Sequence, residues 1–335
     1  MLISPHADAL APGLATGIGS LPHHDAPAAA LLSMRVHPKL PAVPQLPELT
    51  PREGLIAQWA GALPEVTVGR DGSLSIDCER AAEPIDAAFT SATHSGLFAF
   101  LEAADVSAPP RVKIQVVGPL TLGVALEQAG LPKALAFQRA GEAVRAWTRA
   151  LEVLITVRMP HTPVLLFIDE PALVLWRRNE APLEREQAVD LLSSSLAATS
   201  FLTGVHVCGD GDLRLAFEAG PAVLGVPVSD ALITDADVLA RHVDASGWIA
   251  WGAVPTDRPI GDSTDALWRR LVAVWCELTR RGCDPVRLRT RGIITPACGL
   301  AGHGLTQAER ALRLAADIAD RVGDQSVAAR LTVGA

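Results

Sequence analysis

The sequence contains no run of basic residues and no apolar run long enough to cross a bilayer. Its 29 Lys and Arg residues face 37 Asp and Glu residues, which gives a net charge of -8 and no basic stripe to follow a phosphate backbone. A Walker-type phosphate loop is also missing. The residues up to Pro12 lack a basic start followed by a long apolar stretch. We therefore expect a cytoplasmic protein that binds neither nucleic acid nor membranes.

Cysteine is scarce. The chain has five cysteines, Cys78, Cys208, Cys276, Cys283 and Cys298. An odd number scattered over 335 residues fits reduced thiols better than a disulfide framework. Thiolate chemistry is therefore available to this protein.

Apolar runs alternate with helical patterns along the chain, and hydrophobic residues make up 49% of it. Val164 to Ile168 is a continuous apolar run, which is typical of a strand buried on both faces. About eight strand-plus-helix units can be counted, the number that closes a (β/α)8 barrel. We expect one α/β domain, a (β/α)8 TIM barrel over residues 1–335, extended by a small hairpin at Gly69 to Asp77.

The other elements are expected as follows. Strands are predicted at Arg111 to Val117, Gly204 to Cys208, Ala222 to Val228, Trp248 to Trp251 and Gly292 to Thr295, with an early strand ending at Gly19-Ser20. Helical spacing runs from Pro84 to Ala104, and from Ala125 to Met159 with a break at Gly130-Leu131-Pro132.

Polar residues gather where the predicted strands end. They are Gly19-Ser20, Gly118-Pro119, Asp169-Glu170, His206 with Cys208, Ser229-Asp230 and Cys298. Barrels of this kind carry their chemistry at the carboxyl ends of the strands, so these residues are expected to meet in one pocket.

The pair His206 and Cys208 points to a metal. Side chains alternate along a strand, so two residues that are two apart face the same way and can hold one ion. Imidazole and thiolate are ligands that zinc prefers, and Cys298 from another strand would supply a third. Taken alone, His206 is more often a core histidine and Cys208 a small apolar filler. The constellation, rather than either residue, favours zinc.

Two other motifs have a simpler alternative. Gly19-Ser20 could let backbone amides approach a small ligand, or could be a plain turn after the first strand. Asp169 and Glu170 could bind a substrate, or could cap the helix that follows them.

At these residues the chain resembles the catalytic C-terminal half of cobalamin-independent methionine synthase, within the superfamily that includes uroporphyrinogen decarboxylase. The matching motifs are Ile18-Gly19-Ser20-Leu21-Pro22, Gly118-Pro119, Ile168-Asp169-Glu170-Pro171-Ala172-Leu173, His206-x-Cys208 and Pro296-x-Cys298-Gly299-Leu300. They follow the family's order and spacing over almost the whole chain.

The resemblance implies a zinc ion held by His206, Cys208 and Cys298, with an acidic fourth ligand after the next strand. That position is Glu in the synthase, and the matching place 22 residues beyond Cys208 is Asp230. Asp is a competent zinc ligand, but its side chain is shorter by one methylene.

The resemblance also implies a substrate. In the family, the aspartate that corresponds to Asp169 binds the amino group of homocysteine, and the turn corresponding to Gly19-Ser20 holds its carboxylate. A role for Glu170 in substrate binding is a further expectation. The reaction implied is attack of a zinc-bound thiolate on an electrophilic methyl group, with Asp169 as the catalytic carboxylate.

Three departures from the family keep other functions open. A chain of 335 residues has no room for the synthase's N-terminal barrel, Thr256-Asp257-Arg258 stands where the synthase has a histidine, and no match is found for the Glu that grips the homocysteine amine. The donor could be methylcobalamin, a corrinoid protein or methyltetrahydrofolate. Alternatives are a corrinoid-type methyltransferase for another thiol and a zinc- and amino-acid-binding paralogue without turnover.

Overall fold

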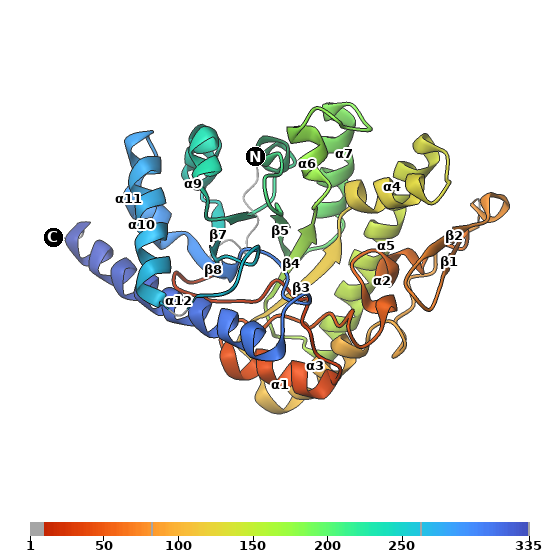
Figure 1. Ribbon diagram of the computed structural model, residues 1–335, viewed down its shortest axis with the longest axis horizontal. Helices are drawn as coiled ribbons and strands as arrows, with labels where there is room; N and C mark the ends of the chain where they lie inside the picture. The colour runs from red at the N-terminus through yellow and green to blue at the C-terminus, as the bar shows by residue number, and fades with distance from the viewer. Residues whose placement is uncertain (1–9, 82, 262, 334–335) are drawn as a thin grey trace.

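A curled parallel sheet forms the centre of the computed structural model, which describes residues 10–81, 83–261 and 263–333 (Figure 1). The sheet has six strands in the order β3-β4-β5-β6-β7-β8. Their bounds are β3 Val112–Val117, β4 Val164–Asp169, β5 Leu202–His206, β6 Val223–Pro227, β7 Trp248–Val254 and β8 Gly292–Pro296. Consecutive strands pair in parallel, so their carboxyl ends lie at one edge.

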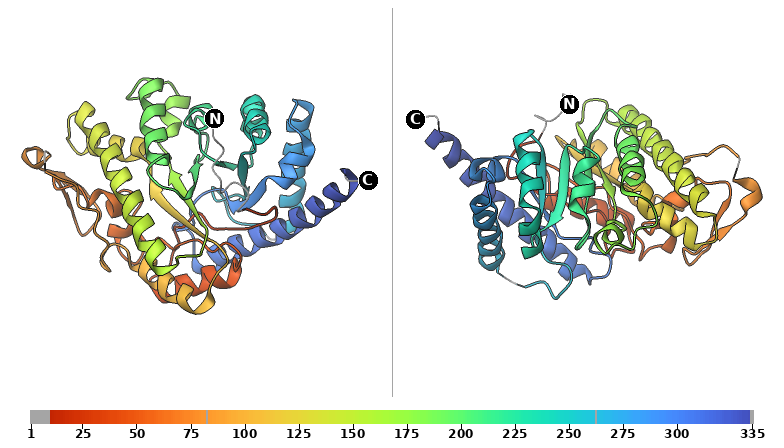
Figure 2. Two further views of the ribbon diagram at one scale, coloured as in Figure 1. Left: turned by 180° about the vertical axis from the view of Figure 1, so that it is seen from behind. Right: turned by 90° about the horizontal axis from the view of Figure 1, so that it is seen from above.

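Helices cover the outside of this sheet, as the views from behind and from above show (Figure 2). They are α1 Ala26–Val36, α2 Ala57–Ala60, α3 Ser95–Ser107, α4 Pro119–Gln128, α5 Lys133–Arg158, α6 Leu173–Arg177, α7 Arg185–Leu196, α8 Leu213–Glu218, α9 Ala236–Asp244, α10 Thr264–Arg280, α11 Pro285–Thr290 and α12 Leu305–Val333. Short 3-10 helices are η2 Pro51–Glu53, η3 Cys78–Arg80 and η4 Asp230–Asp235.

The prediction of a closed eight-stranded barrel is wrong, because the structure has a partial α/β barrel with six strands. The early segment predicted to end as a strand at Gly19-Ser20 is irregular, and so is the proline-rich segment after α1. They make only single bridges, Ala15 to Ile294, Ser20 to Gln45 and Ala42 to Lys113. Their composition explains this. The first contains Gly17 and Gly19, and the second contains prolines at 38, 41, 44 and 47, which cannot donate to a strand ladder.

The predicted hairpin is confirmed. Strands β1 (Val66–Val68) and β2 (Leu74–Ile76) pair antiparallel. Asp71 accepts hydrogen bonds from the Ser73 amide at 3.1 Å and the Ser73 hydroxyl at 2.6 Å, and Gly72 has a φ of 80° that favours glycine. At the base of this hairpin, Arg139 of α5 pairs with the buried Glu65 at 2.7 Å.

The interior of the curled sheet is filled by large side chains set against glycines. Phe167 of β4 lies beside Gly204 and Gly225, and a Cβ added at either glycine would come within 3.0 Å of the Phe167 ring. Apolar neighbours of Phe167 in this inner cluster include Leu165, Leu202 and Trp248. The missing side chains of the two glycines therefore leave room for one aromatic ring across the interior.

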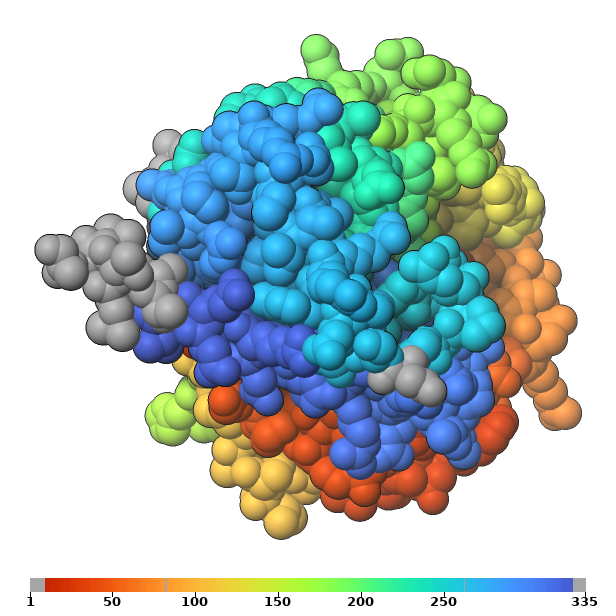
Figure 3. Space-filling model, turned by 60° about the vertical axis from the view of Figure 1, so that its left-hand side comes forward, coloured from red at the N-terminus to blue at the C-terminus, as the bar shows by residue number. Residues whose placement is uncertain are grey.

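Two helices that are far apart in the sequence lie side by side. Helix α12 packs against α1, and Arg35 pairs with Glu309 at 3.0 Å (Figure 3). His37, just after α1, donates from Nε2 to the Leu312 carbonyl at 3.0 Å. This contact fixes the C-terminal helix beside the irregular segments near Gly19.

None of the described helices is both long and apolar enough to cross a membrane. The N-terminal stretch in which a targeting signal would begin lies mostly outside the described residues, which start at residue 10.

We expect the free energy of unfolding to fall as the pH is lowered from about 6.5 towards 4. Burial lowers the pKa of His37, His94 and His242 to about 4, so these rings stay neutral in the folded protein. The unfolded chain binds more protons in this range, and protonation therefore favours unfolding. Denaturant titrations at pH 7 and pH 5 measure the loss. His242→Gln should reduce the pH dependence of the free energy of unfolding, whereas His24→Gln, at an exposed position, should leave it unchanged. A wild-type free energy of unfolding that is the same at pH 7 and pH 5 would contradict the expectation.

Candidate metal centre

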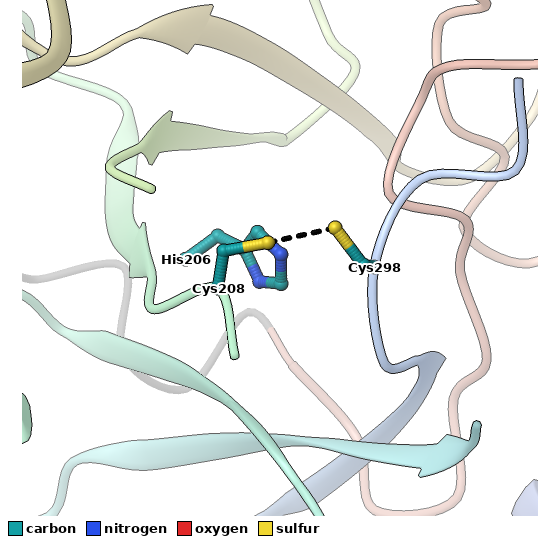
Figure 4. A group of neighbouring side chains, drawn as sticks. All are labelled: His206, Cys208 and Cys298. Carbon is teal, nitrogen blue, oxygen red and sulfur yellow. Dashed lines mark hydrogen bonds between the residues drawn. The ribbon is translucent and has the colours of Figure 1, made fainter. Parts of the chain in front are cut away.

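Three side chains converge at the carboxyl edge of the sheet (Figure 4). His206 is the last residue of β5, Cys208 follows two residues later, and Cys298 lies two residues beyond β8. One ligand atom of each lies within 4.8 Å of the others, and the two sulfur atoms are 2.7 Å apart. Residues 90 positions apart in the chain are thus brought together as the sequence predicted, in a group that could hold a metal ion.

The turn that carries Cys298 is held from both sides. The Ala297 amide donates to the Val254 carbonyl at 2.8 Å, and the Leu300 amide donates to the Ser20 carbonyl at 2.9 Å. A Cβ on Gly299 would come within 2.0 Å of Ser20 Oγ, so a larger residue there would displace the Ser20 side chain. These contacts place the Gly19-Ser20 turn directly beside the turn of Cys298.

The donor atoms fit a cation. His206 is 4% exposed, and its Nε2 has no hydrogen-bond partner within the described part of the chain. A buried ring nitrogen without a partner is costly, and a metal ion would satisfy it. One imidazole and two thiols form the ligand set that zinc takes in sites with an open fourth position.

The two thiols differ in acidity because they share a hydrogen bond. Either sulfur can be the donor in this bond, which lowers the pKa of Cys298, with His206 acting in the same direction. The same hydrogen bond, together with burial, raises the pKa of Cys208. Thiolate is the form of cysteine that binds metals, so a lowered pKa of Cys298 favours metal binding.

Asp169 ends β4 and is aligned with His206 in the neighbouring strand. It is 6% exposed, and its Oδ1 has no hydrogen-bond partner among the described residues. Burial raises the pKa of this carboxyl, while the positive charge of Lys113 acts to lower it. Asp169 therefore offers an unsatisfied oxygen next to the metal group, where a donor such as an ammonium would be bound.

In Glu170, in contrast, both carboxylate oxygens accept hydrogen bonds from within the protein. Its carboxylate accepts hydrogen bonds from the Leu120 amide at 2.8 Å, the Thr121 amide at 2.8 Å and the Thr121 hydroxyl at 2.6 Å. These groups belong to the first turn of α4, so Glu170 fixes the Gly118-Pro119 turn from the neighbouring strand. A helix start is a favourable place for a carboxylate. The contacts give Glu170 a structural role, and its predicted contact with substrate has no unsatisfied atom to support it.

Asp230 is not brought into the group. It is exposed at the first position of η4, and the group of possible metal ligands found among the described residues contains only His206, Cys208 and Cys298. The spacing that suggested Asp230 does not determine the path of the chain after β6. The 3-10 helix begins there and leaves its carboxylate in solvent.

Lys113 is a residue of this interior that the sequence motifs did not indicate. Its side chain is 1% exposed and lies inside the sheet, where it donates to the Ile18 carbonyl and, at 3.0 Å, to Gln115 Oε1. A signal was present: Lys113 and Gln115 occupy alternate positions of a strand whose other residues are apolar. Two inward polar residues in a buried strand are unusual enough to indicate a functional interior.

Comparison of the chain with models of known protein families gives no match, and comparison with curated proteins gives none either.

We expect His206→Ala and Cys298→Ala each to reduce zinc retained through gel filtration from about one ion per chain to near none. Removing either ligand leaves two donors, too few for a stable site. Cys276→Ala is the matched control, because Cys276 is an exposed thiol on α10. The number of zinc ions per chain is measured by mass spectrometry. An unchanged number in both His206→Ala and Cys298→Ala would rule out a zinc site at these residues.

A separate prediction concerns Asp230 as the fourth metal ligand. Because the Asp230 carboxylate is exposed and lies outside the group, Asp230→Ala should retain zinc with an affinity close to that of the wild type. Competition with a zinc chelator measures the affinity. A drop of tenfold or more, about 1.4 kcal/mol, would instead make Asp230 a ligand.

Proposed function

We propose that this protein is a zinc-dependent methyltransferase that moves a methyl group to the thiol of homocysteine or a similar small thiol. The observation that carries the proposal is the convergence of His206, Cys208 and Cys298 beside an unsatisfied buried carboxylate, Asp169. The resemblance to cobalamin-independent methionine synthase supports it through the same residues.

Each part of the site has a task in this proposal. His206, Cys208 and Cys298 would hold the metal ion, and three protein ligands would leave room for the substrate sulfur. Zinc, when bound, lowers the pKa of that thiol and keeps it as a thiolate at neutral pH. Asp169 binds the substrate ammonium, which orients the sulfur and favours thiols that carry an amine over those that lack it. The sulfur supplies the electron pair of the new S–C bond, and the donor keeps the pair of the bond that breaks.

The methyl donor is the open part of the proposal. Thr256-Asp257-Arg258 stands where the synthase has a histidine, and His303 Nε2 donates to the Thr256 carbonyl at 3.2 Å. We therefore place methylcobalamin or a corrinoid protein before methyltetrahydrofolate as the donor.

The free thiols of the site need a reducing environment, which supports the cytoplasm as its location. The proposed partners are the acceptor thiol and the methyl donor, which is a small molecule or a corrinoid protein, with no nucleic acid or membrane.

The test is a methyl-transfer assay with zinc-loaded protein and homocysteine, given methylcobalamin and methyltetrahydrofolate in parallel. Methionine formed is measured, and we expect it with at least one donor. If zinc is present and neither donor yields methionine, a binding protein without turnover or an enzyme for another thiol replaces this proposal.

Asp169→Asn should lower kcat/KM for homocysteine by about 10- to 100-fold, because a charge-assisted hydrogen bond to the ammonium contributes about 1.5–3 kcal/mol. With 4-sulfanylbutanoate, which lacks the amine, the same variant should change kcat/KM little. Equal losses with both thiols would show that Asp169 does not recognise the amino group.

A further inference from the structure

Lys113 is the one buried lysine of a chain that has three. Lys39 and Lys133 are exposed, whereas Lys113 is 1% exposed inside the sheet. Asp169 acts on its charge without forming a direct ion pair among the described residues, and the ammonium lies 5.3 Å from the centre of the Phe167 ring. Burying an ammonium without a paired carboxylate is expensive, so its presence needs an explanation.

The ammonium is bound to the backbone of the Gly19 turn. It donates to the Ile18 carbonyl and to Gln115 Oε1, and Gln115 Nε2 donates to the Val43 carbonyl at 2.9 Å. Gly19 has a φ of 135°, and a Cβ there would come within 2.2 Å of Gln115 Nε2. The side chains of Lys113 and Gln115 thus pack against the Gly19 turn and fix its position. Because a Cβ at position 19 would collide with Gln115, only glycine fits there.

The contact of Lys113 with the turn determines where the Gly19 amide points. The carbonyl and the amide of one trans peptide point in opposite directions. Because the Ile18 carbonyl faces Lys113, the Gly19 N–H faces away from it, and it donates no hydrogen bond within the described residues. A positive charge on the carbonyl side also polarises the peptide and makes its N–H a stronger donor.

The same charge acts on Asp169. Lys113 opposes the effect of burial on that carboxyl, so both groups belong to one electrostatic unit. Lys113 connects the carboxylate that would bind an ammonium with the turn that would bind a carboxylate. A substrate that carries one group of each sign adds no net charge to this interior.

We propose that Lys113 is a positioning residue that makes the site selective for α-amino-acid thiols, by presenting the Gly19 N–H to the substrate carboxylate and supplying a positive charge behind it. The inference rests on the proposed function, in which the acceptor is a small thiol. It assigns the carboxylate half of substrate recognition to a residue that touches the turn and not the substrate.

The test compares two thiols that differ in the carboxylate alone, homocysteine and 3-aminopropane-1-thiol. Binding to the cobalt-substituted protein is followed by the thiolate-to-cobalt absorption, with wild type, Lys113→Met and the surface control Lys39→Met. Wild type and Lys39→Met should prefer homocysteine. Lys113→Met should lose about tenfold in homocysteine affinity, about 1.4 kcal/mol, and stay within about twofold for the aminothiol.

If Lys113 had only a structural role, Lys113→Met would weaken the binding of both thiols equally, and that result would overturn the proposal. An unchanged preference for homocysteine in Lys113→Met would also overturn it. If Lys113→Met does not fold, as judged by circular dichroism, Lys113→Gln serves instead. It keeps a polar donor and removes the charge, and the same selective loss is expected.

A metal-free arm separates this inference from the proposed function. Calorimetry compares L-methionine with 3-(methylthio)propylamine, neither of which offers a thiol. Suppose that no thiol binds to cobalt but wild type prefers L-methionine and Lys113→Met does not. The metal–thiol proposal then fails and the carboxylate site stands. Equal binding of the two amines to wild type would overturn the inference about Lys113.

Discussion

The meeting of β5 with the turn after β8 is the constraint on which the site depends. His206 and Cys208 reach the carboxyl edge along one strand, but Cys298 arrives only because the Leu300 amide is bound to the Ser20 carbonyl and the Ala297 amide to Val254. Without these two hydrogen bonds the second sulfur would have no fixed position. The irregular segment at Gly19 is therefore as important to the metal group as the regular strands.

The interior below that edge is unusually polar for a sheet core. Lys113, Gln115, Asp169 and His206 are buried there, and the Lys113 ammonium lies 5.3 Å from the centre of the Phe167 ring, which belongs to the inner apolar cluster. Burial works against the charge of Asp169 and of Lys113, and each moderates the effect on the other. Such an arrangement costs stability and is expected where a fold binds a charged ligand.

The sequence predicted the six strands of the sheet and the convergence of His206, Cys208 and Cys298, because the strands and the first pair of side chains follow from simple periodicity. The apolar run from Val164 became β4, the break at Gly130 to Pro132 separates α4 from α5, and alternation placed His206 and Cys208 together. The closed barrel was not predictable from unit counting, since prolines and glycines prevent ladders in the first two segments.

Other differences have equally local causes. Helix α3 begins at Ser95 and not near Pro84, because the buried Glu53 accepts a hydrogen bond from the Ser95 amide and so fixes the helix start. This contact spans 42 residues and leaves no mark in the local pattern. Asp230 was proposed as a ligand because it lies 22 residues beyond Cys208, where the resembling family has an acidic ligand. Its exposure follows from the 3-10 helix η4, which a residue count cannot predict.

X-ray absorption at the zinc edge tests the central claim most directly. For zinc-loaded protein we predict one nitrogen and two sulfur neighbours from the chain, the sulfurs at about 2.3 Å, and a third sulfur when homocysteine is added. A spectrum with only nitrogen and oxygen neighbours, or a sulfur count that homocysteine leaves unchanged, would contradict a thiol-activating centre at His206, Cys208 and Cys298.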